Sequence, residues 1–153
     1  MALVRLMHAK LHRVTVTEAN RNYVGSITID KELLDSVGIL PLEEVDIVNV
    51  NNGNRWHTYV LPGEPGKGQI CPNGGGALLC QPGDLLIIWA NEERDRADVM
   101  FHGHEAKVLV ADEQNRAKQV FHQTLTPSEN GLNYDGHKQF NDQVLDSSLM
   151  VGV

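Results

Sequence analysis

The segment Tyr23-Val24-Gly25-Ser26-Ile27-Thr28-Ile29-Asp30 places a Gly-Ser peptide directly before a short run rich in β-branched residues. Glycine adopts backbone angles that other residues avoid and lets a neighbouring group approach its carbonyl closely. The Ser26 hydroxyl can therefore attack the Gly25 carbonyl, and β-elimination would then cleave the chain and leave a pyruvoyl group at position 26. On its own, a Gly-Ser pair is more often a turn before a strand, so the rest of the chain has to decide between the two interpretations.

The composition is that of one globular domain. The chain has 153 residues, of which 41% are hydrophobic, and no stretch is apolar enough to suggest a membrane span. A formal net charge of −7 argues against binding to nucleic acid or to an anionic membrane, because phosphates need a basic surface. Since the first residues lack the long apolar stretch of a signal peptide, we expect a cytoplasmic protein with Cys71 and Cys80 reduced.

The stretch from Lys10 to Thr17 has the pattern of a β-strand. Its two-residue repeat predicts that Lys10, His12, Val14 and Val16 share one face. A lysine and a histidine would then point the same way, as in a binding site. The alternative is a lysine of an edge strand that is turned to solvent.

A helix and two further strands are expected next. Ser26 to Ile29 forms a strand, and Asp30 caps a helix over residues 31–37 that ends at Gly38. Residues 45–50 form a strand that the Asn52-Gly53 pair turns into a hairpin.

The returning strand of this hairpin covers residues 55–61. By alternation, one face carries Arg55, His57 and Tyr59, and the other carries Trp56, Thr58 and Val60. Arg55 and Tyr59 are thus expected to flank one pocket.

Beyond a loop rich in glycine and proline, Gly74, Gly75 and Gly76 expose backbone amides at the expected start of a helical turn, which suits a bound carboxylate, although a flexible loop fits the sequence equally well. Residues 85–90 are apolar enough for a central strand. The charged stretch 91–98 is expected to be a surface loop, and strands follow at 107–111 and 119–125. Many short strands with few helices predict an all-β barrel, with a polar C-terminal tail from residue 126.

Several short segments carry a family resemblance. They are Lys10-Leu11-His12-Arg13, Tyr23-Val24-Gly25-Ser26, Ile29-Asp30, Asn52-Gly53-Asn54-Arg55, Thr58-Tyr59, Asn73-Gly74 and Gly83-Asp84. In this order they resemble the pyruvoyl-dependent aspartate 1-decarboxylases of bacterial pantothenate synthesis. The resemblance implies a mainly β, double-psi β-barrel domain over residues 1–125, with residues 126–153 as a C-terminal extension that is not a separate domain. It also implies a homotetramer with sites between subunits, and self-cleavage into a β chain of residues 1–25 and an α chain of residues 26–153.

The resemblance assigns the chemistry to a few residues. Ser26 becomes the covalent pyruvoyl cofactor, which forms a Schiff base with L-aspartate and accepts electrons as carbon dioxide leaves. Arg55 matches one carboxylate of the substrate, and Lys10 matches the second carboxylate or the negative charge that develops. Tyr59 is implied to donate a proton, since the ordinary tyrosine pKa of about 10 keeps it protonated. Thr58 is implied to bind substrate and, before cleavage, to hydrogen-bond the Gly25 carbonyl.

The remaining implied residues bind substrate or support the site. Asn73, Gly74, Gly75 and Gly76 match the substrate loop, and His12 and Tyr23 have supporting roles. Relatives usually carry alanines where this chain has Gly75 and Gly76, and we expect the loss of two methyl groups to enlarge the pocket or to loosen the loop.

The other histidines raise the alternative of a metal site. His102 and His104 are two residues apart, and His122 lies on a later strand. No pattern supplies further ligands, so we expect surface histidines and no metal.

Three functions remain open at this point. The first is a lyase that converts L-aspartate to β-alanine and carbon dioxide. The second is an uncleaved barrel that serves as a binding or assembly subunit. The third is a decarboxylase for a related amino acid such as glutamate. The sequence also leaves open whether cleavage needs a maturation activator protein.

Overall fold

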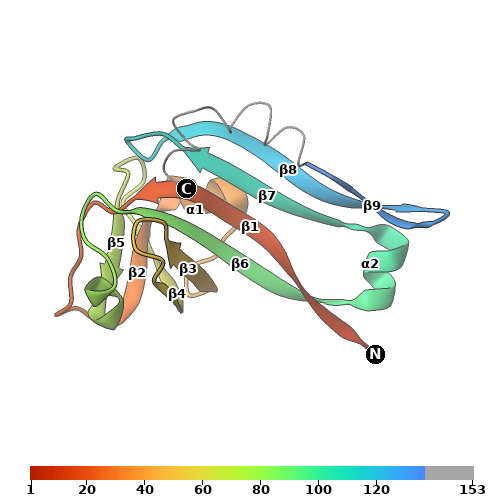
Figure 1. Cartoon of the computed structure of the whole chain (residues 1–153), viewed down its shortest axis with the longest axis horizontal. Coiled ribbons are helices and arrows are strands. Elements are labelled where there is room, and N and C mark those ends of the chain that lie inside the picture. The colour runs from red at the N-terminus through yellow and green to blue at the C-terminus, as the bar shows by residue number, and fades with distance from the viewer. Residues whose placement is uncertain (137–153) are drawn as a thin grey trace.

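The computed structural model describes residues 1–136, which form a strongly bent sheet with short helices at its ends and edges (Figure 1). The elements are β1 (Leu3–Thr15), β2 (Ser26–Asp30), α1 (Lys31–Val37), β3 (Glu44–Asn49), β4 (Arg55–Gly63), β5 (Ile70–Asn73), the 3-10 helix η1 (Gly74–Leu78), β6 (Leu85–Asp95), α2 (Arg96–His102), β7 (His104–Ala111), β8 (Ala117–Ser128) and β9 (Gly131–Asp135). The mainly β fold with short helices, of the double-psi barrel class, is as expected.

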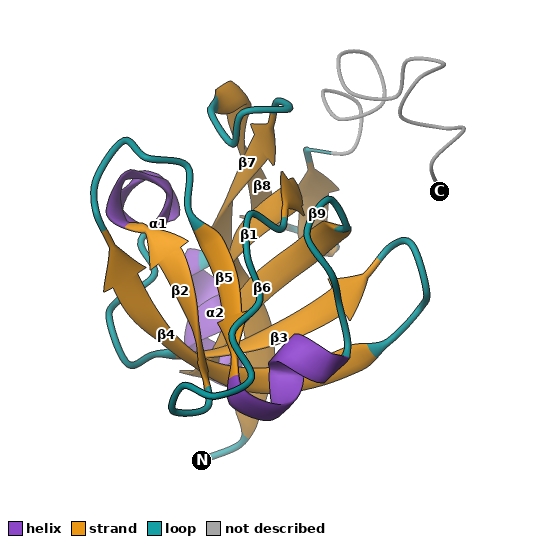
Figure 2. Ribbon diagram, turned by 90° about the vertical axis from the view of Figure 1, so that its left-hand side faces the viewer, coloured by secondary structure: helices purple, strands orange, loops and turns teal. Residues whose placement is uncertain are grey.

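The strand order of the sheet is β5-β2-β4-β3-β6-β1-β7-β8-β9. Two neighbouring pairs, β2 with β4 and β1 with β7, are parallel, and the other pairs are antiparallel. β2 to β5 gather with α1 at one end of the molecule, while β1, β6, β7 and β8 run toward α2 at the other (Figures 1 and 2).

The hydrophobic core fills the inner face of the bent sheet. Leu11, Ile27, Ile47, Val60 and Ile88, from five different strands, are each at most 1% exposed. Full burial of an aliphatic side chain contributes about 1.5–3 kcal/mol, so these residues hold the strands together. Because side chains alternate along a strand, their sequence neighbours lie on the outer face, where polar groups are tolerated.

Asp30 fixes the end of β2, the strand that Ser26 opens. Its carboxylate accepts hydrogen bonds from the backbone N–H groups of Glu32 at 2.8 Å, Gly66 at 3.0 Å and Gly68 at 2.7 Å. The predicted helix over residues 31–37 is therefore confirmed with its cap, and Gly38 ends it with φ +81°.

The predicted face of the first strand is wrong beyond His12. Arg13 has φ +62°, and the pairing of β1 with β6 shifts register between His12 and Val14. Such a bulge inserts one extra residue and moves the following side chains to the opposite face. Val14 and Val16 consequently join the core, on the face opposite Lys10 and His12.

The prediction of a surface loop at residues 91–98 is also wrong. β6 continues to Asp95, paired with the start of β1 from Leu3 onward, and α2 follows directly. The charged residues are tolerated because both faces of this part of the ribbon are partly exposed. Arg94 also stabilises the junction, since its guanidinium donates to the Asp98 carboxylate at 2.7 Å.

The sheet continues past residue 125 into the range that the resemblance assigned to the C-terminal extension. β8 reaches Ser128, and β9 pairs with it antiparallel. The rest of that extension, residues 137–153, lies outside the described residues. Within residues 1–136, no helix combines the length and the apolar character that crossing a bilayer requires.

Candidate functional site

Ser26 opens β2 and is only 3% exposed. The Asn73 side-chain amide on β5 donates to the Ser26 hydroxyl at 2.8 Å and to the Thr28 hydroxyl at 3.0 Å. The Ser26 hydroxyl in turn donates to the Val24 carbonyl at 3.2 Å. The hydroxyl group is thus held pointing back along the chain, toward the Val24 carbonyl that precedes Gly25.

Gly74 lies directly against Gly25. A methyl group at Gly74 would stand 2.7 Å from the Gly25 Cα and 3.3 Å from the Tyr23 carbonyl oxygen, and Gly74 has φ +62°. Its N–H donates to the Asn20 carbonyl at 2.9 Å, which fixes this close approach. Only glycine fits here, so the predicted substrate loop packs on the peptide that would be cleaved.

Cys71 orients the Asn73 amide, a contact that the sequence analysis missed. The Cys71 thiol donates to the Asn73 Oδ1 at 3.3 Å, which leaves the Nδ2 of Asn73 facing the two hydroxyls. Burial raises the pKa of the Cys71 thiol, so it remains a protonated donor at neutral pH. The two-residue spacing on one strand face was the signal available in the sequence.

Lys10 and Arg55 meet at Trp89 on the outer face of the sheet. The Arg55 guanidinium lies 5.9 Å from the centre of the Trp89 ring, and Lys10 is the strand partner of Trp89. Burial lowers the pKa of Lys10. Burial first, and then the charges of Lys10 and Arg13, lower the pKa of His12 to about 4, so His12 is neutral at pH 7.

The predicted site residues therefore form two separate clusters. We call Gly25, Ser26, Asn73 and Gly74 the serine group, and Lys10, Arg55 and Trp89 the cation group. Lys10 is on β1, four places from β2 in the sheet, which is roughly 19 Å along the sheet at the usual strand spacing of about 4.8 Å. Arg55 is on β4, next to β2, but four residues along the strand from Tyr59, the neighbour of Ser26, which is roughly 13 Å. One chain thus brings the predicted residues together in two clusters rather than in one.

Tyr59 and Thr58 lie on opposite faces of β4. Ile27 pairs with Val60 in the parallel β2–β4 ladder, so Tyr59 stands beside Ser26 on the outer face. Thr58 faces inward, and none of the hydrogen bonds recorded for residues 1–136 joins it to Gly25. Its role toward the Gly25 carbonyl remains a prediction.

Gly75 and Gly76 differ in their surroundings. A methyl group at Gly75 would meet nothing within 4 Å, whereas one at Gly76 would lie 2.8 Å from the indole nitrogen of Trp56. The expected helical turn is present as η1. The extra space exists beside Gly75, but Trp56 fills it beside Gly76.

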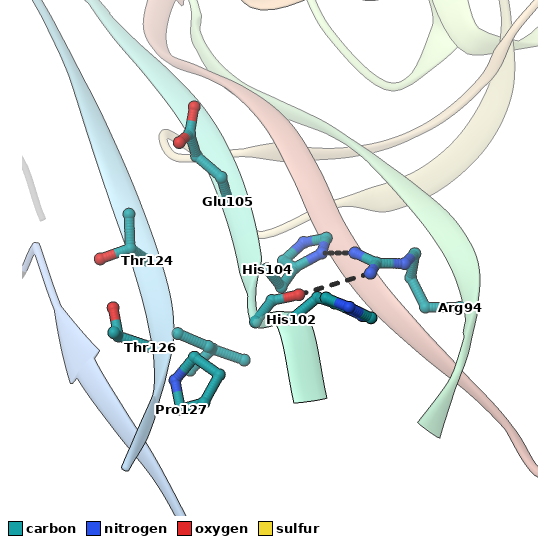
Figure 3. Close-up of a pocket in the computed structure, with 9 residues that line it drawn as sticks. Arg94, His102, His104, Glu105, Thr124, Thr126 and Pro127 are labelled. Atoms are coloured by element: carbon teal, nitrogen blue, oxygen red, sulfur yellow. Dashed lines mark hydrogen bonds between the residues drawn. The ribbon is translucent and has the colours of Figure 1, made fainter. Parts of the chain in front are cut away.

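Two of the histidines considered as metal ligands, His102 and His104, line a hollow near α2, at the far end of the molecule from β2 (Figures 1 and 3). His104 Nε2 lies 2.8 Å from the Met7 carbonyl oxygen, which only accepts, so His104 Nδ1 accepts from Arg94 at 2.9 Å. His102 and His122 pair instead with nearby carboxylates. Within residues 1–136, no three histidine, cysteine or acidic side chains converge as a metal site requires.

Comparison with known proteins gives a consistent result. The model of the family described as aspartate decarboxylase matches residues 2–118. The chain is 69% identical over 137 residues to the aspartate 1-decarboxylase of Gloeothece citriformis, covering 90% of this chain and 88% of that protein. It is 65% identical over 149 residues to the enzyme of that name from Crocosphaera subtropica (97% and 99% covered), and 53% identical over 115 residues to that of Bacillus subtilis (75% and 89% covered). The chain belongs to the aspartate decarboxylase family.

Proposed function

We propose that this protein is a self-processing lyase that converts L-aspartate to β-alanine and carbon dioxide. The single observation that carries the proposal is the Ser26 hydroxyl, held by Asn73 beside the Gly25 peptide. The names of the relatives support the same reaction. By family likeness, the β-alanine would serve pantothenate synthesis in the cytoplasm.

Self-cleavage needs no group from outside the chain except water. The Ser26 oxygen bonds to the Gly25 carbonyl carbon, and the peptide C–N bond breaks as the nitrogen takes up a proton. Loss of the Ser26 α-proton then breaks the Cβ–O bond and releases the Gly25 carboxylate. Hydrolysis of the resulting dehydroalanine releases ammonia and leaves the pyruvoyl group on the new α chain.

The surroundings of Ser26 fit a pyruvoyl group. The position is buried, and the Asn73 amide that donates to the Ser26 hydroxyl would offer the same N–H to an oxygen of the group. Gly74 leaves the neighbouring backbone close and free of side chains. When formed, this group supplies the electron sink that decarboxylation requires.

The cation group suits a substrate with two carboxylates. Arg55 offers a planar fork of donors, and Lys10 a compact charge. At about 4 Å and an effective dielectric constant near 20, one such ion contact is worth about 4 kcal/mol before desolvation, which favours a diacid over a neutral amino acid. Because the two groups are separate in one chain, we assign the substrate site to the interface of a homotetramer, with the cation group of one copy facing the serine group of the next.

Tyr59 is the proposed proton donor. It stands on the same outer face as Ser26, on the adjacent strand. Its hydroxyl hydrogen would be delivered to the carbon that loses carbon dioxide, and the hydroxyl would then recover a proton from solvent.

The proposal is tested by offering the purified, cleaved protein a panel of amino acids and measuring the release of carbon dioxide. We expect release from L-aspartate, and none from Ser26→Ala protein. Faster release from glutamate would instead favour the third function, for which the open space beside Gly75 is the relevant observation. Absence of release from every amino acid would contradict the proposal.

A further inference from the structure

We propose that Trp56 is a positioning residue for self-cleavage: its ring packs against the loop of residues 74–76 and holds Gly74 in contact with Gly25. Gly76 is the matching residue that makes room for the indole. The inference rests on the proposed function, since it concerns the rate at which the Gly25–Ser26 peptide is cleaved.

The Trp56 ring occupies the space that a side chain at Gly76 would need. A methyl group at Gly76 would lie 2.8 Å from the Trp56 indole nitrogen and 3.5 Å from each of two indole carbons. That nitrogen is buried and has no hydrogen-bond partner among the described residues. Burying an unpaired N–H is unfavourable, so packing rather than a polar bond holds the ring in this place.

The other side of the same loop carries the contact with the cleavage site. Gly74 approaches Gly25 so closely that a methyl group would stand 2.7 Å from the Gly25 Cα. Asn73, the residue directly before Gly74, holds the Ser26 hydroxyl. The loop is therefore enclosed between the Trp56 ring and the Gly25–Ser26 peptide.

The far end of the loop is anchored. The Leu79 carbonyl, just beyond η1, accepts hydrogen bonds from the side-chain amides of Asn49 at 3.2 Å, Asn52 at 3.1 Å and Asn54 at 3.1 Å. Because Leu79 is fixed, a displacement of Gly76 cannot be absorbed by movement of the loop toward its C-terminal end. A shift at Gly76 is instead passed to Gly74 and Asn73, and thereby to the Ser26 hydroxyl.

The structure offers a matched pair of variants for a test. Gly76→Ala and Gly75→Ala each add one methyl group to the same short helix, but only the first meets Trp56. Trp56→Phe removes the indole nitrogen and the fused ring, which lets the smaller ring tilt away from a methyl group. The set is Gly76→Ala, Gly75→Ala, Trp56→Phe and the double variant Trp56→Phe/Gly76→Ala, each followed by intact mass over time and by thermal unfolding.

We expect Gly76→Ala to slow cleavage by about tenfold or more, because small misplacements of reacting groups cost large factors in rate. Gly75→Ala should keep the melting temperature of the parent chain, because its methyl group meets no atom within 4 Å. The double variant should recover most of the lost rate, so that the two changes are strongly non-additive. For the cleaved fraction, Gly76→Ala should raise KM for aspartate more than it lowers kcat, since the same loop contacts the substrate.

Two results separate the inference from the function it rests on. A parent chain that cleaves, with a Gly76→Ala variant that cleaves equally fast or that loses only melting temperature, overturns the positioning role alone. A double variant as slow as Gly76→Ala does the same. A parent chain that never cleaves overturns the inference together with the proposed function.

Discussion

The Asn73 side-chain nitrogen lies 2.8 Å from the Ser26 hydroxyl oxygen, across the antiparallel pair formed by β2 and β5. The two residues are direct strand partners, so the backbone ladder itself sets their separation. Ser26 and Asn73 are 47 positions apart in the sequence, and only the fold brings the Asn73 amide within hydrogen-bonding distance of the Ser26 hydroxyl.

Asn73→Asp should slow self-cleavage by about tenfold, because a carboxylate of the same shape accepts hydrogen bonds but donates none. The Ser26 hydroxyl would then turn away from its present position. Intact mass over time measures the rate, and the melting temperature reports whether the fold is kept. A folded Asn73→Asp chain that cleaves at the parent rate would remove Asn73 from the cleavage step.

Cys71→Ala should also slow cleavage, by a smaller factor. It leaves the Asn73 Oδ1 without its donor, which costs on the order of 1 kcal/mol and allows the amide to turn. Cys71→Ser keeps an O–H donor and is the matched control. The parent chain should cleave fastest, Cys71→Ser next and Cys71→Ala slowest; equal rates for the two variants would show that the thiol contact has no role.

Arg55→Ala should cleave as the parent does but turn over aspartate poorly. Arg55 belongs to the cation group, away from Ser26 in the same chain, and its loss should lower kcat/KM roughly a hundredfold, as expected for a lost contact between an arginine and a carboxylate. Steady-state kinetics on fully cleaved protein measures this. Arg96→Ala, an exposed arginine of α2, is the control and should keep parent kinetics.

The stability of the fold should depend on pH through His12. Its pKa is about 4 in the folded protein and 6.5 ordinarily. Between these values the unfolded chain binds a proton that the folded chain does not, so the free energy of unfolding falls as the pH drops from 6.5 to 4. The loss is at most about 3 kcal/mol.

His12→Asn should weaken the dependence of the free energy of unfolding on pH between 6.5 and 4. The measurement is denaturant unfolding of both proteins at several pH values between about 4 and about 7, the range that brackets the two pKa values. Parallel curves for the parent and His12→Asn would contradict the assignment to His12.

Much of the fold could be predicted from local patterns. The helix over residues 31–37 follows from an acidic cap, an apolar face and a closing glycine, all within a few positions. The strands around residues 26–29, 45–50 and 55–61 follow from β-branched runs and the Asn52-Gly53 turn. The bulge at Arg13 escaped prediction because no glycine marks it, and only the pairing with β6 requires it.

Local sequence patterns predict less of the candidate site than of the fold. Family likeness named Ser26, Asn73, Lys10 and Arg55, but their division into two clusters depends on the strand order of the whole sheet. The contact of Cys71 with Asn73 lies within one strand, where the two-residue spacing indicates a shared face but not a hydrogen bond. The contact of Trp56 with Gly76 joins different elements, and no pattern of spacing specifies it. The charged residues 91–95 were misassigned because their strand is determined by its partner β1 rather than by its own composition.

The most direct test of the central claim is the intact mass of the purified protein incubated without any other protein. The account predicts two chains, residues 1–25 ending in a free carboxylate and residues 26–153 beginning with a pyruvoyl group whose carbonyl is reduced by borohydride. If the purified protein completes this cleavage alone, maturation requires no activator protein. An active protein that retains a single full-length chain with Ser26 unaltered would contradict the account.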